Sequence, residues 1–463
     1  MREATAKRFV MVANLLNRII SLALSICLVM NWAPPAAAQQ SRLSLLRDAE
    51  IEHTIRIYAT PIFDAAGLDP SAITLYLIDD NSLNAFVAGG MNLFINSGLL
   101  MRSRDPLEVM GVIAHETGHI AGGHLARAQE ALRNASIEAI VAAVLGAAAA
   151  VVGGGDAGAA VIAGGTGVAQ RSLLKYSRIQ ESSADHAGVS FLESAGYSSR
   201  GLLNFLGVLA GEEALLADSQ DPYLRSHPLS QERIEYLRNF VEHTSRYSDK
   251  PAPPELVVLH GRMVGKLVGF LVPLGQVLRR YPLSDQSLEA RYARAIAYYR
   301  ASDLDKALPL LDQLLAEHPE DAYFHELRGQ ILFENGRIAE AVDWYQRAVD
   351  LDPTEPLLRL GLAQAQLETE RQDLVTPALA QLEEVVRREP RNGFAWHLLA
   401  IAYGRTDQLG MSALALSESA LARNNAAEAK AQADRAMHIL PENSPAWLRA
   451  QDIKSAAKRL EES

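Results

Sequence analysis

A short run of histidines and a glutamate is the feature of this sequence best suited to chemistry. The residues are His115-Glu116-Thr117-Gly118-His119. On an α-helix, positions i and i+4 lie one turn apart on the same face, so the two imidazoles can bind one tetrahedral zinc ion. Glu116 would project beside them, where it can take a proton from a water molecule that the metal activates. The motif therefore predicts a hydrolytic metal site.

The residues before this motif are almost all apolar, as Val109-Met110 and Val112-Ile113-Ala114 show. Such a segment predicts a buried helix, in which two histidines and a glutamate would be costly unless a ligand satisfied them. The alternative is a chance match, which occurs in roughly a few per cent of chains of this length. A chance match requires neither an apolar helix nor a second motif further along the chain.

A catalytic zinc site needs a third protein ligand. His124 lies five residues after His119, about 140° round a continuous helix, so we expect a partly exposed polar residue and not a ligand. Glu181 and Asp185 are four residues apart on a predicted helix and share one face. One of these carboxylates can bind the metal while the other orients a ligand imidazole. Alone, the pair fits an exposed acidic helix cap equally well, but the need for a third ligand favours the metal site.

The elements that must position these residues lie within one predicted α+β domain at residues 41–250. Its expected elements are a helix at 42–65, strands at 73–78, 85–88 and 93–95, and a helix at 107–129. Asp105-Pro106 would begin the last helix as its cap and first-turn proline. The motif and its surroundings thus predict a helix packed against a small sheet.

Residues 1–38 have the pattern of a signal peptide, with a basic start, an apolar stretch at Ile19–Met30 and Ala36-Ala37-Ala38 at the end. We expect cleavage after Ala38 and export of the mature chain. An uncleaved N-terminal anchor is the alternative, although the apolar stretch is short for a membrane span. The one cysteine, Cys27, lies in this segment. The exported chain would therefore have no disulfide, no catalytic thiol and no Cys-bound metal.

The net charge excludes one class of function. It is −11 for the whole chain. The signal segment contributes four cations and one acid, so the exported chain carries −14. A chain this acidic does not favour a nucleic-acid partner.

Residues 139–170 are nearly all Ala, Val and Gly, interrupted by Asp156. Each half of this block is shorter than the ~20 residues that cross a bilayer. The length favours a buried or mobile helical hairpin. Peripheral contact with a membrane, or an apolar flap over the active site, stay open as alternatives.

A proline-rich boundary at Pro251-Ala252-Pro253-Pro254 separates this domain from the rest of the chain. We expect residues 251–282 to form a linker that contains a bridging helix at 257–280. Residues 283–460 then show a period near the ~34 residues of tetratricopeptide (TPR) repeats.

The clearest repeat is Ala322–Pro353, in which small residues such as Gly329 let two helices cross and Tyr345 fills the space between them. The interval from Pro390 to Pro441 is half a repeat too long, so we expect an extra helix near 411–421 before a final one at 429–436. A plain helical bundle is the alternative. Stacked repeats would offer concave surfaces to segments of other proteins.

Three motifs together resemble the zinc metallopeptidase family of the HtpX and CAAX prenyl proteases. They are His115-Glu116-x-x-His119, Glu181-x-x-x-Asp185 and Ser226-His227-Pro228. The resemblance implies a zincin-like (gluzincin) α+β metalloprotease domain followed by an all-α TPR-like domain. It also implies one Zn²⁺ per chain bound by His115, His119 and Glu181, with Glu116 as general base and Asp185 behind a ligand.

The same resemblance suggests roles for residues outside the zinc ligands. His227 matches a histidine that can occupy the fourth position of the zinc and keep the enzyme inactive. A loop histidine without such a role is equally compatible with the sequence. Arg233 matches a recurrent arginine with a structural role. Asn84–Ala88 and the following Gly89-Gly90 match an edge strand that pairs with an extended substrate.

The resemblance implies an endopeptidase of the bacterial cell envelope that acts in quality control or assembly of outer-membrane proteins. Its partners would be protein substrates, including misfolded outer-membrane proteins, and their assembly machinery, bound through the TPR region. The alternative is a non-catalytic chaperone or scaffold with a self-inhibited zinc site. A membrane-embedded prenyl protease is disfavoured because the sequence has no long apolar spans.

Overall fold

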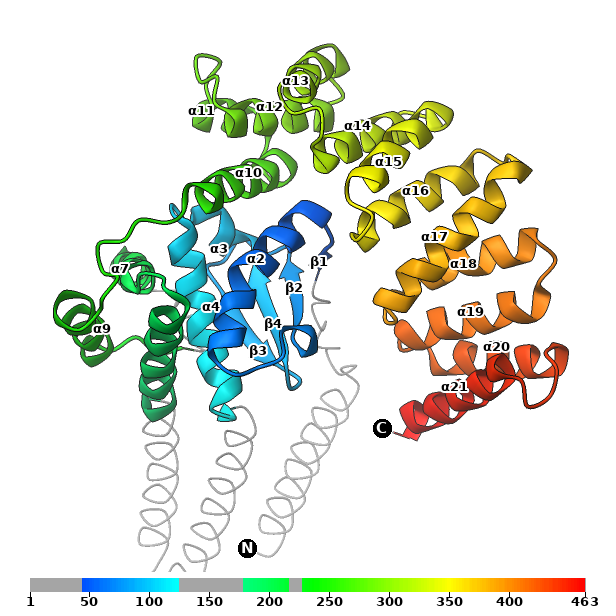
Figure 1. Cartoon of the computed structure of the whole chain (residues 1–463), viewed down its shortest axis with the longest axis horizontal. Coiled ribbons are helices and arrows are strands. Elements are labelled where there is room, and N and C mark those ends of the chain that lie inside the picture. The colour runs from blue at the N-terminus through cyan, green and yellow to red at the C-terminus, as the bar shows by residue number, and fades with distance from the viewer. Residues whose placement is uncertain (1–43, 125–177, 216–226, 463) are drawn as a thin grey trace, which may run out of the picture. The chain divides into compact units, whose positions relative to one another are not determined.

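A computed structural model describes residues 44–124, 178–215 and 227–462 (Figure 1). The expected signal peptide at 1–38 and the Ala/Gly-rich block at 139–170 lie outside these ranges. Contacts unite Leu45–Ser463 into one unit. Within it, an α+β region precedes a long series of helices, which confirms the predicted fold class. None of the described helices has both the length and the apolar character needed to cross a membrane.

The α+β region is built on a small mixed sheet. Its strands are β1 (Leu45–Leu46), β2 (Thr74–Ile78), β3 (Ala85–Ala88) and β4 (Asn92–Asn96). Their order is β1-β2-β4-β3, with β2 and β4 parallel and the other neighbours antiparallel. Strand β3 is therefore at an edge of the sheet. It is joined to β4 by a turn in which Gly89 and Gly90 adopt positive φ angles that side chains disfavour.

The first helix, α2 (Ala49–Ala65), is shorter than the sequence predicts. The expected helix at 42–65 is wrong at its start because Leu45–Leu46 pair with β2 instead. Asp48 then begins the helix, and its side chain accepts a hydrogen bond from the backbone N–H of Ile51. A short helix, α3 (Ser97–Arg102), connects β4 to the next element.

Helix α4 (Pro106–Ala121) carries the histidine motif and begins as predicted. The Asp105 side chain accepts a hydrogen bond from the backbone N–H of Leu107, and Pro106 occupies the first turn. The predicted end at residue 129 is wrong. The helix stops at Ala121 because Gly122 and Gly123 follow it, and Gly123 adopts a φ of 62°. Nearly the whole of α4 is buried.

Two glycines let α4 approach the helix at 178–195 closely. A Cβ at Gly118 would lie 2.7 Å from the backbone oxygen of Ala184. On the facing helix, a Cβ at Gly188 would lie 3.2 Å from the backbone nitrogen of His115. We call this contact the glycine seam. It brings the helix that carries Glu181 to within side-chain reach of the histidines.

Four further helices complete the first half of the described chain. They are α7 (Arg200–Leu215), α9 (Gln231–His243), α10 (Pro254–Leu271) and α11 (Leu274–Arg280). The bridging helix expected at 257–280 is therefore two helices. They separate at Val272-Pro273 because proline cannot supply the N–H that a continuous helix needs.

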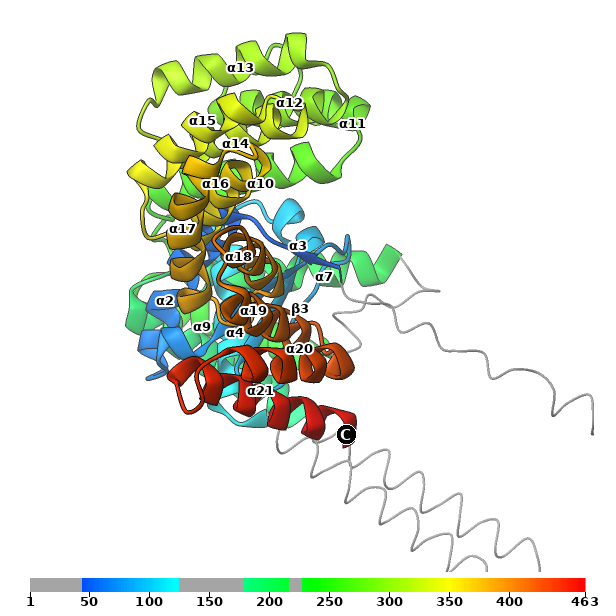
Figure 2. The same ribbon diagram turned by 90° about the vertical axis from the view of Figure 1, so that its right-hand side faces the viewer.

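The remaining helices follow one another as antiparallel neighbours, as TPR repeats do (Figure 2). They are α12 (Leu288–Arg300), α13 (Leu304–Glu317), α14 (Ala322–Glu334), α15 (Ile338–Leu351), α16 (Pro356–Glu368), α17 (Val375–Arg388), α18 (Gly393–Arg405), α19 (Leu409–Ala422), α20 (Ala426–Ile439) and α21 (Pro445–Glu462). As predicted, Gly329 makes room for the Tyr345 ring, which a Cβ would meet at 3.0 Å.

The helices near the C-terminus agree with the sequence prediction in part. The extra helix expected near 411–421 is present as α19, so three helices lie between Pro390 and Pro441. Helix α20 is not the last one, because α21 follows it. Pro441 therefore ends the first helix of a pair, whereas the earlier prolines follow second helices, and this shift produces the long interval.

A buried ionic network joins α2 to the first repeats. Arg262 donates to Glu50 at 2.6 Å and to Asp321 at 3.0 Å. Lys266 lies 3.4 Å from Glu50, and the Tyr292 hydroxyl donates to the same carboxylate at 2.7 Å. Each buried charge in this network has an opposite charge beside it. Removing one partner from such a network leaves a buried charge uncompensated, which is strongly destabilising. The network therefore fixes how α2 packs against the first repeats.

The glycine seam leads to a first prediction. Gly118→Ala should lower the thermal unfolding midpoint, because the added methyl group collides with the backbone of the facing helix and the cost is of order 1–3 kcal/mol. The matched control is Gly207→Ala in α7, where an added Cβ meets nothing within 4 Å. This control should be neutral or stabilising by about 0.5–1 kcal/mol, since alanine favours helix over glycine. Equal midpoints for the two variants would contradict the seam.

Candidate metal centre

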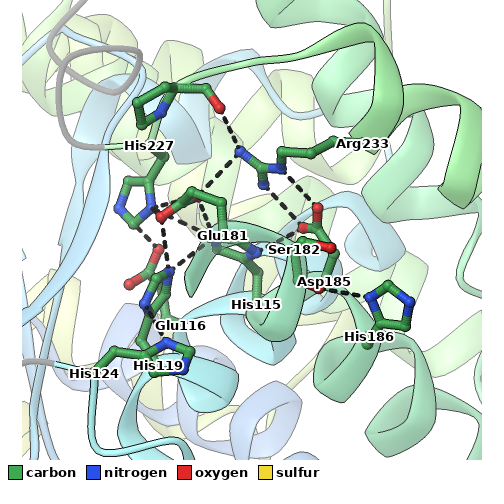
Figure 3. A network of polar contacts seen from close by, with 11 residues as sticks. His115, Glu116, His119, His124, Glu181, Ser182, Asp185, His186, His227 and Arg233 are labelled. Carbon is green, nitrogen blue, oxygen red and sulfur yellow. Dashed lines mark hydrogen bonds and ion pairs between the residues drawn. The ribbon is translucent and has the colours of Figure 1, made fainter. Parts of the chain in front are cut away.

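His115 and His119 project from the same face of α4 into the protein interior (Figure 3). Their Nε2 atoms are 3.2 Å apart. The His115 side chain is fully buried, and that of His119 is 9% exposed. The two imidazoles therefore converge on one point, as the spacing predicts.

Two residues from other elements reach the same point. Glu181, from the helix at 178–195, places Oε2 3.3 Å from His115 Nε2 and Oε1 3.3 Å from His119 Nε2. His227, from the segment before α9, places Nδ1 3.2 Å from Glu181 Oε2 and 3.3 Å from His115 Nε2. One potential ligand atom from each of the four side chains lies within 4.8 Å of the others. We call these four residues the histidine–glutamate cluster.

Asp185 fixes the orientation of the first histidine. Its Oδ1 is 2.9 Å from His115 Nδ1, so that nitrogen donates to the carboxylate and Nε2 faces the cluster. Burial alone would lower the pKa of His115, but the carboxylates of Asp185 and Glu181 outweigh it and raise the pKa to about 10. Burial would likewise raise the pKa of Asp185, but hydrogen bonds from Arg233 and His115 hold it below its usual value. A bound cation would replace the proton that these carboxylates retain on His115.

Arg233 connects three parts of the site. Its guanidinium donates to Asp185 Oδ2 at 2.6 Å and lies 3.0 Å from Glu181 Oε2. It also donates to the backbone oxygen of Pro228 at 3.0 Å, next to His227. The pKa of Glu181 is well below its usual value, because nearby histidines outweigh the effect of burial. The Arg233 guanidinium thus contacts Glu181 and Asp185, both on the helix at 178–195, and the loop that carries His227.

Glu116 differs from the other acids of the site. Both of its carboxylate oxygens are buried, and neither accepts a hydrogen bond from any described residue. Its Oε1 lies 3.4 Å from Nε2 of His227, a side chain that carries a positive charge only when it is protonated. A buried carboxylate without hydrogen bonds is costly. The Glu116 oxygens therefore retain hydrogen-bonding capacity that a water molecule or a ligand would use.

The charges and donors of the site fit a divalent metal ion. The buried carboxylates of Glu116, Glu181 and Asp185 face one guanidinium, that of Arg233. Once a bound cation has displaced the proton of His115, these three carboxylates and one guanidinium carry a net charge of −2. Two imidazoles and a carboxylate are the ligands of many catalytic zinc sites. The donor set, its burial and its charge are thus consistent with zinc.

His124 is the clearest correction to the sequence analysis. The sequence predicted a partly exposed residue, but the structure buries it, and its Nδ1 lies 3.0 Å from His119 Nδ1. The prediction assumed a continuous helix, whereas α4 ends at Ala121 and a turn at Gly122 and Gly123 separates it from His124. With Nε2 of His119 facing the cluster, its Nδ1–H donates to His124. The glycine pair was the signal that could have revealed this contact.

The remaining candidate, Asn84, lies outside the histidine–glutamate cluster. It directly precedes β3, and its backbone oxygen accepts a hydrogen bond from Asn96 N at 2.9 Å. Its side-chain oxygen is buried and accepts no hydrogen bond from a described residue. Strand β3 packs against α4, the helix that carries His115 and His119.

Comparison with known proteins agrees with this geometry. Residues 46–241 match peptidase family M48, and residues 292–356 match the tetratricopeptide repeat. The beta-barrel assembly-enhancing protease of Yersinia pestis is 29% identical over 332 residues, which cover 71% of this chain and 67% of the relative. The protein of the same name from Escherichia coli (strain K12) is 27% identical, over 63% of this chain and 60% of the relative.

A shorter relative matches part of the chain. The metalloprotease YcaL of Escherichia coli (strain K12) is 29% identical over 176 residues, which cover 37% of this chain and 63% of that protein. The matches therefore extend over both halves of the chain, and the match to M48 includes every residue of the histidine–glutamate cluster. Residues 46–241 form a metalloprotease domain of peptidase family M48, tetratricopeptide repeats follow it, and the chain resembles the beta-barrel assembly-enhancing proteases over most of its length.

Proposed function

We propose that this chain is a zinc-dependent endopeptidase of the bacterial cell envelope that acts in quality control or assembly of outer-membrane proteins. The observation that carries the proposal is the buried histidine–glutamate cluster beside the carboxylate of Glu116, which accepts no hydrogen bond from a described residue. We assign peptide hydrolysis to residues 41–250, a bridge to 251–282 and partner binding to the repeats at 283–460. The names of the relatives support the class of substrate.

In this proposal one Zn²⁺ is bound by His115, His119 and Glu181. Zinc supplies a Lewis acid that polarises the scissile carbonyl and lowers the pKa of water. Asp185 keeps Nε2 of His115 directed at the ion through the bond to Nδ1. Three protein ligands leave a fourth position open for catalysis.

Glu116 is the general base. Its carboxylate has no competing hydrogen bond among the described residues, so it is free to take the proton of the attacking water and give it to the leaving amine. Burial excludes bulk water from this carboxylate and strengthens its interaction with the reacting groups.

His227 is the regulatory residue of the proposal. Its imidazole lies within 3.4 Å of groups on both sides of the site, Glu116 and Glu181. A histidine at that point can bind the fourth position of the zinc and exclude substrate. When displaced, the same side chain can donate a hydrogen bond to the oxyanion of the transition state.

The second candidate function is a chaperone or scaffold in which His227 keeps the zinc site closed. The position of His227 within the cluster favours this second candidate. However, a closed site gives no role to the carboxylate of Glu116. We propose a periplasmic location, with a signal peptide removed after Ala38, and protein partners bound by the repeats. For residues 139–170 the sequence favours a buried or mobile helical hairpin, and peripheral membrane contact stays the alternative.

The catalytic prediction concerns the base. Glu116→Gln should bind one zinc per chain, as measured by metal analysis, yet lose at least about 100-fold in the rate of cleavage, the contribution typical of a general base. The substrate for the assay is a misfolded outer-membrane protein, incubated with the purified full chain. Retained cleavage would contradict the role assigned to Glu116, and loss of zinc would make the variant a structural defect instead.

The regulatory prediction concerns the fourth position. His227→Ala should raise the basal rate of cleavage, because removal of the imidazole opens the site, while the zinc content stays at one per chain. The matched control is His243→Ala at the exposed end of α9, which should leave both quantities unchanged. If His227→Ala loses cleavage with its zinc intact, His227 is a catalytic group and not an inhibitor.

A further inference from the structure

Three aromatic rings form a continuous stack across the sheet. Tyr76 on β2 stacks on Phe94 of β4 with ring centroids 4.9 Å apart, and Phe94 stacks on Phe86 of β3 at 5.0 Å. Their planes are nearly parallel, inclined by 14° and 11°. The residues are direct cross-strand partners in the register of the sheet. We call these three rings the aromatic ladder.

The aromatic ladder lies on the sheet face away from the hydrophobic core. Leu77, Leu93 and Ala85, which neighbour the ladder residues along their strands, are buried core residues. Side chains alternate between the two faces of a strand, so the ladder residues point the other way. All three rings are only half-buried, and none belongs to a core cluster of the described chain. The three rings are therefore not part of the hydrophobic core of the described chain.

The ladder ends at β3, which is an edge strand of the sheet among the described residues. Within the described chain, no strand pairs with the far side of β3. The hydrogen bond from Asn96 N to Asn84 O shows which residues of β3 bond to β4. In an antiparallel pair, alternate residues bond to the same neighbour, so Phe86 bonds toward β4. The backbone groups of Ala85 and Val87 therefore face the free edge.

A strand that paired antiparallel with this edge would bond to Ala85 and Val87. One of its residues would then lie opposite Phe86 in a non-hydrogen-bonded pair, the arrangement in which side chains are closest. Strands in a sheet are about 4.8 Å apart, close to the ring spacing of the ladder. An aromatic side chain at that position would extend the stack by one ring.

We propose that Phe86 is a specificity-determining residue that selects substrate segments with an aromatic side chain opposite it. The inference rests on the proposed protease function, because the segment that pairs with β3 is the substrate and β3 packs against the catalytic helix α4. Strands of outer-membrane barrels alternate in polarity and carry aromatic residues near both membrane interfaces. When such a strand is unfolded and extended, it offers the chemistry that the ladder accepts.

Binding of short peptides to the zinc-loaded Glu116→Gln protein tests this proposal without turnover. The probes are labelled ten-residue peptides of Ser, Thr and Val in which a single Phe is moved from one position to the next. Fluorescence anisotropy gives the dissociation constant of each peptide, and the same peptide with Ala at that position is the reference. At one position, Phe should tighten binding by about 2- to 10-fold, the range expected for an aromatic pair.

A double-mutant cycle then assigns the preference to Phe86. In the Glu116→Gln protein with Phe86→Ala, the Phe and Ala peptides should bind equally, whereas Phe86→Tyr should keep the preference because it retains the ring. Phe394→Ala is the matched control, since it removes an exposed ring of α18 in the repeat region and should keep the full preference. Damage to β3 alone would weaken both peptides by the same factor and leave their ratio unchanged.

The proposal is overturned if no position prefers Phe, if the preference survives in Phe86→Ala, or if no peptide binds. These outcomes are separate from failure of the proposed function. The cycle measures a ratio of dissociation constants in an inactive variant, whereas the protease function is tested by cleavage with Glu116 intact. A chain that discriminates peptides but cleaves none would keep the ladder and lose the catalytic assignment.

Discussion

The burial of Glu181 and Asp185 against two histidines is the interaction on which the rest of this structure depends. Carboxylates in a protein interior are tolerated only when hydrogen bonds or opposite charges compensate them. Here the compensation comes from His115 and from Arg233. It requires the two helices to lie unusually close, and the glycine seam at Gly118 permits that approach. Local sequence, helix packing and metal chemistry are thus aspects of one constraint.

In the proposed function, the same interaction connects catalysis to regulation. Arg233 contacts both buried carboxylates and the backbone oxygen of Pro228, which follows His227. A movement of His227 away from the cluster would therefore change the surroundings of the guanidinium that contacts Glu181, the proposed third zinc ligand. The proposed opening of the site and the strength of metal binding are coupled through this side chain. The edge strand proposed to pair with substrate, β3, is a separate element that packs against α4.

Much of this architecture was predictable from the sequence, because local rules decided it. The i, i+4 spacing in α4, its Asp105 cap and the small-residue pattern of the repeats act within a few residues. The failures involve longer-range effects. Pairing of Leu45–Leu46 with β2 shortened α2, and a glycine pair ended α4 and buried His124. The contacts of Arg233 with Asp185 and Pro228 depend on tertiary packing, which no single motif encodes.

The most direct test of the central claim is the position and ligation of the metal in the full chain. Anomalous diffraction at the zinc edge, or X-ray absorption of the purified protein, measures both. The account predicts one zinc per chain, with two imidazole nitrogens at about 2.0–2.1 Å and a carboxylate oxygen at about 2.0–2.2 Å, from His115, His119 and Glu181. A protein that takes up no zinc, or one that binds it away from these residues, would contradict the account.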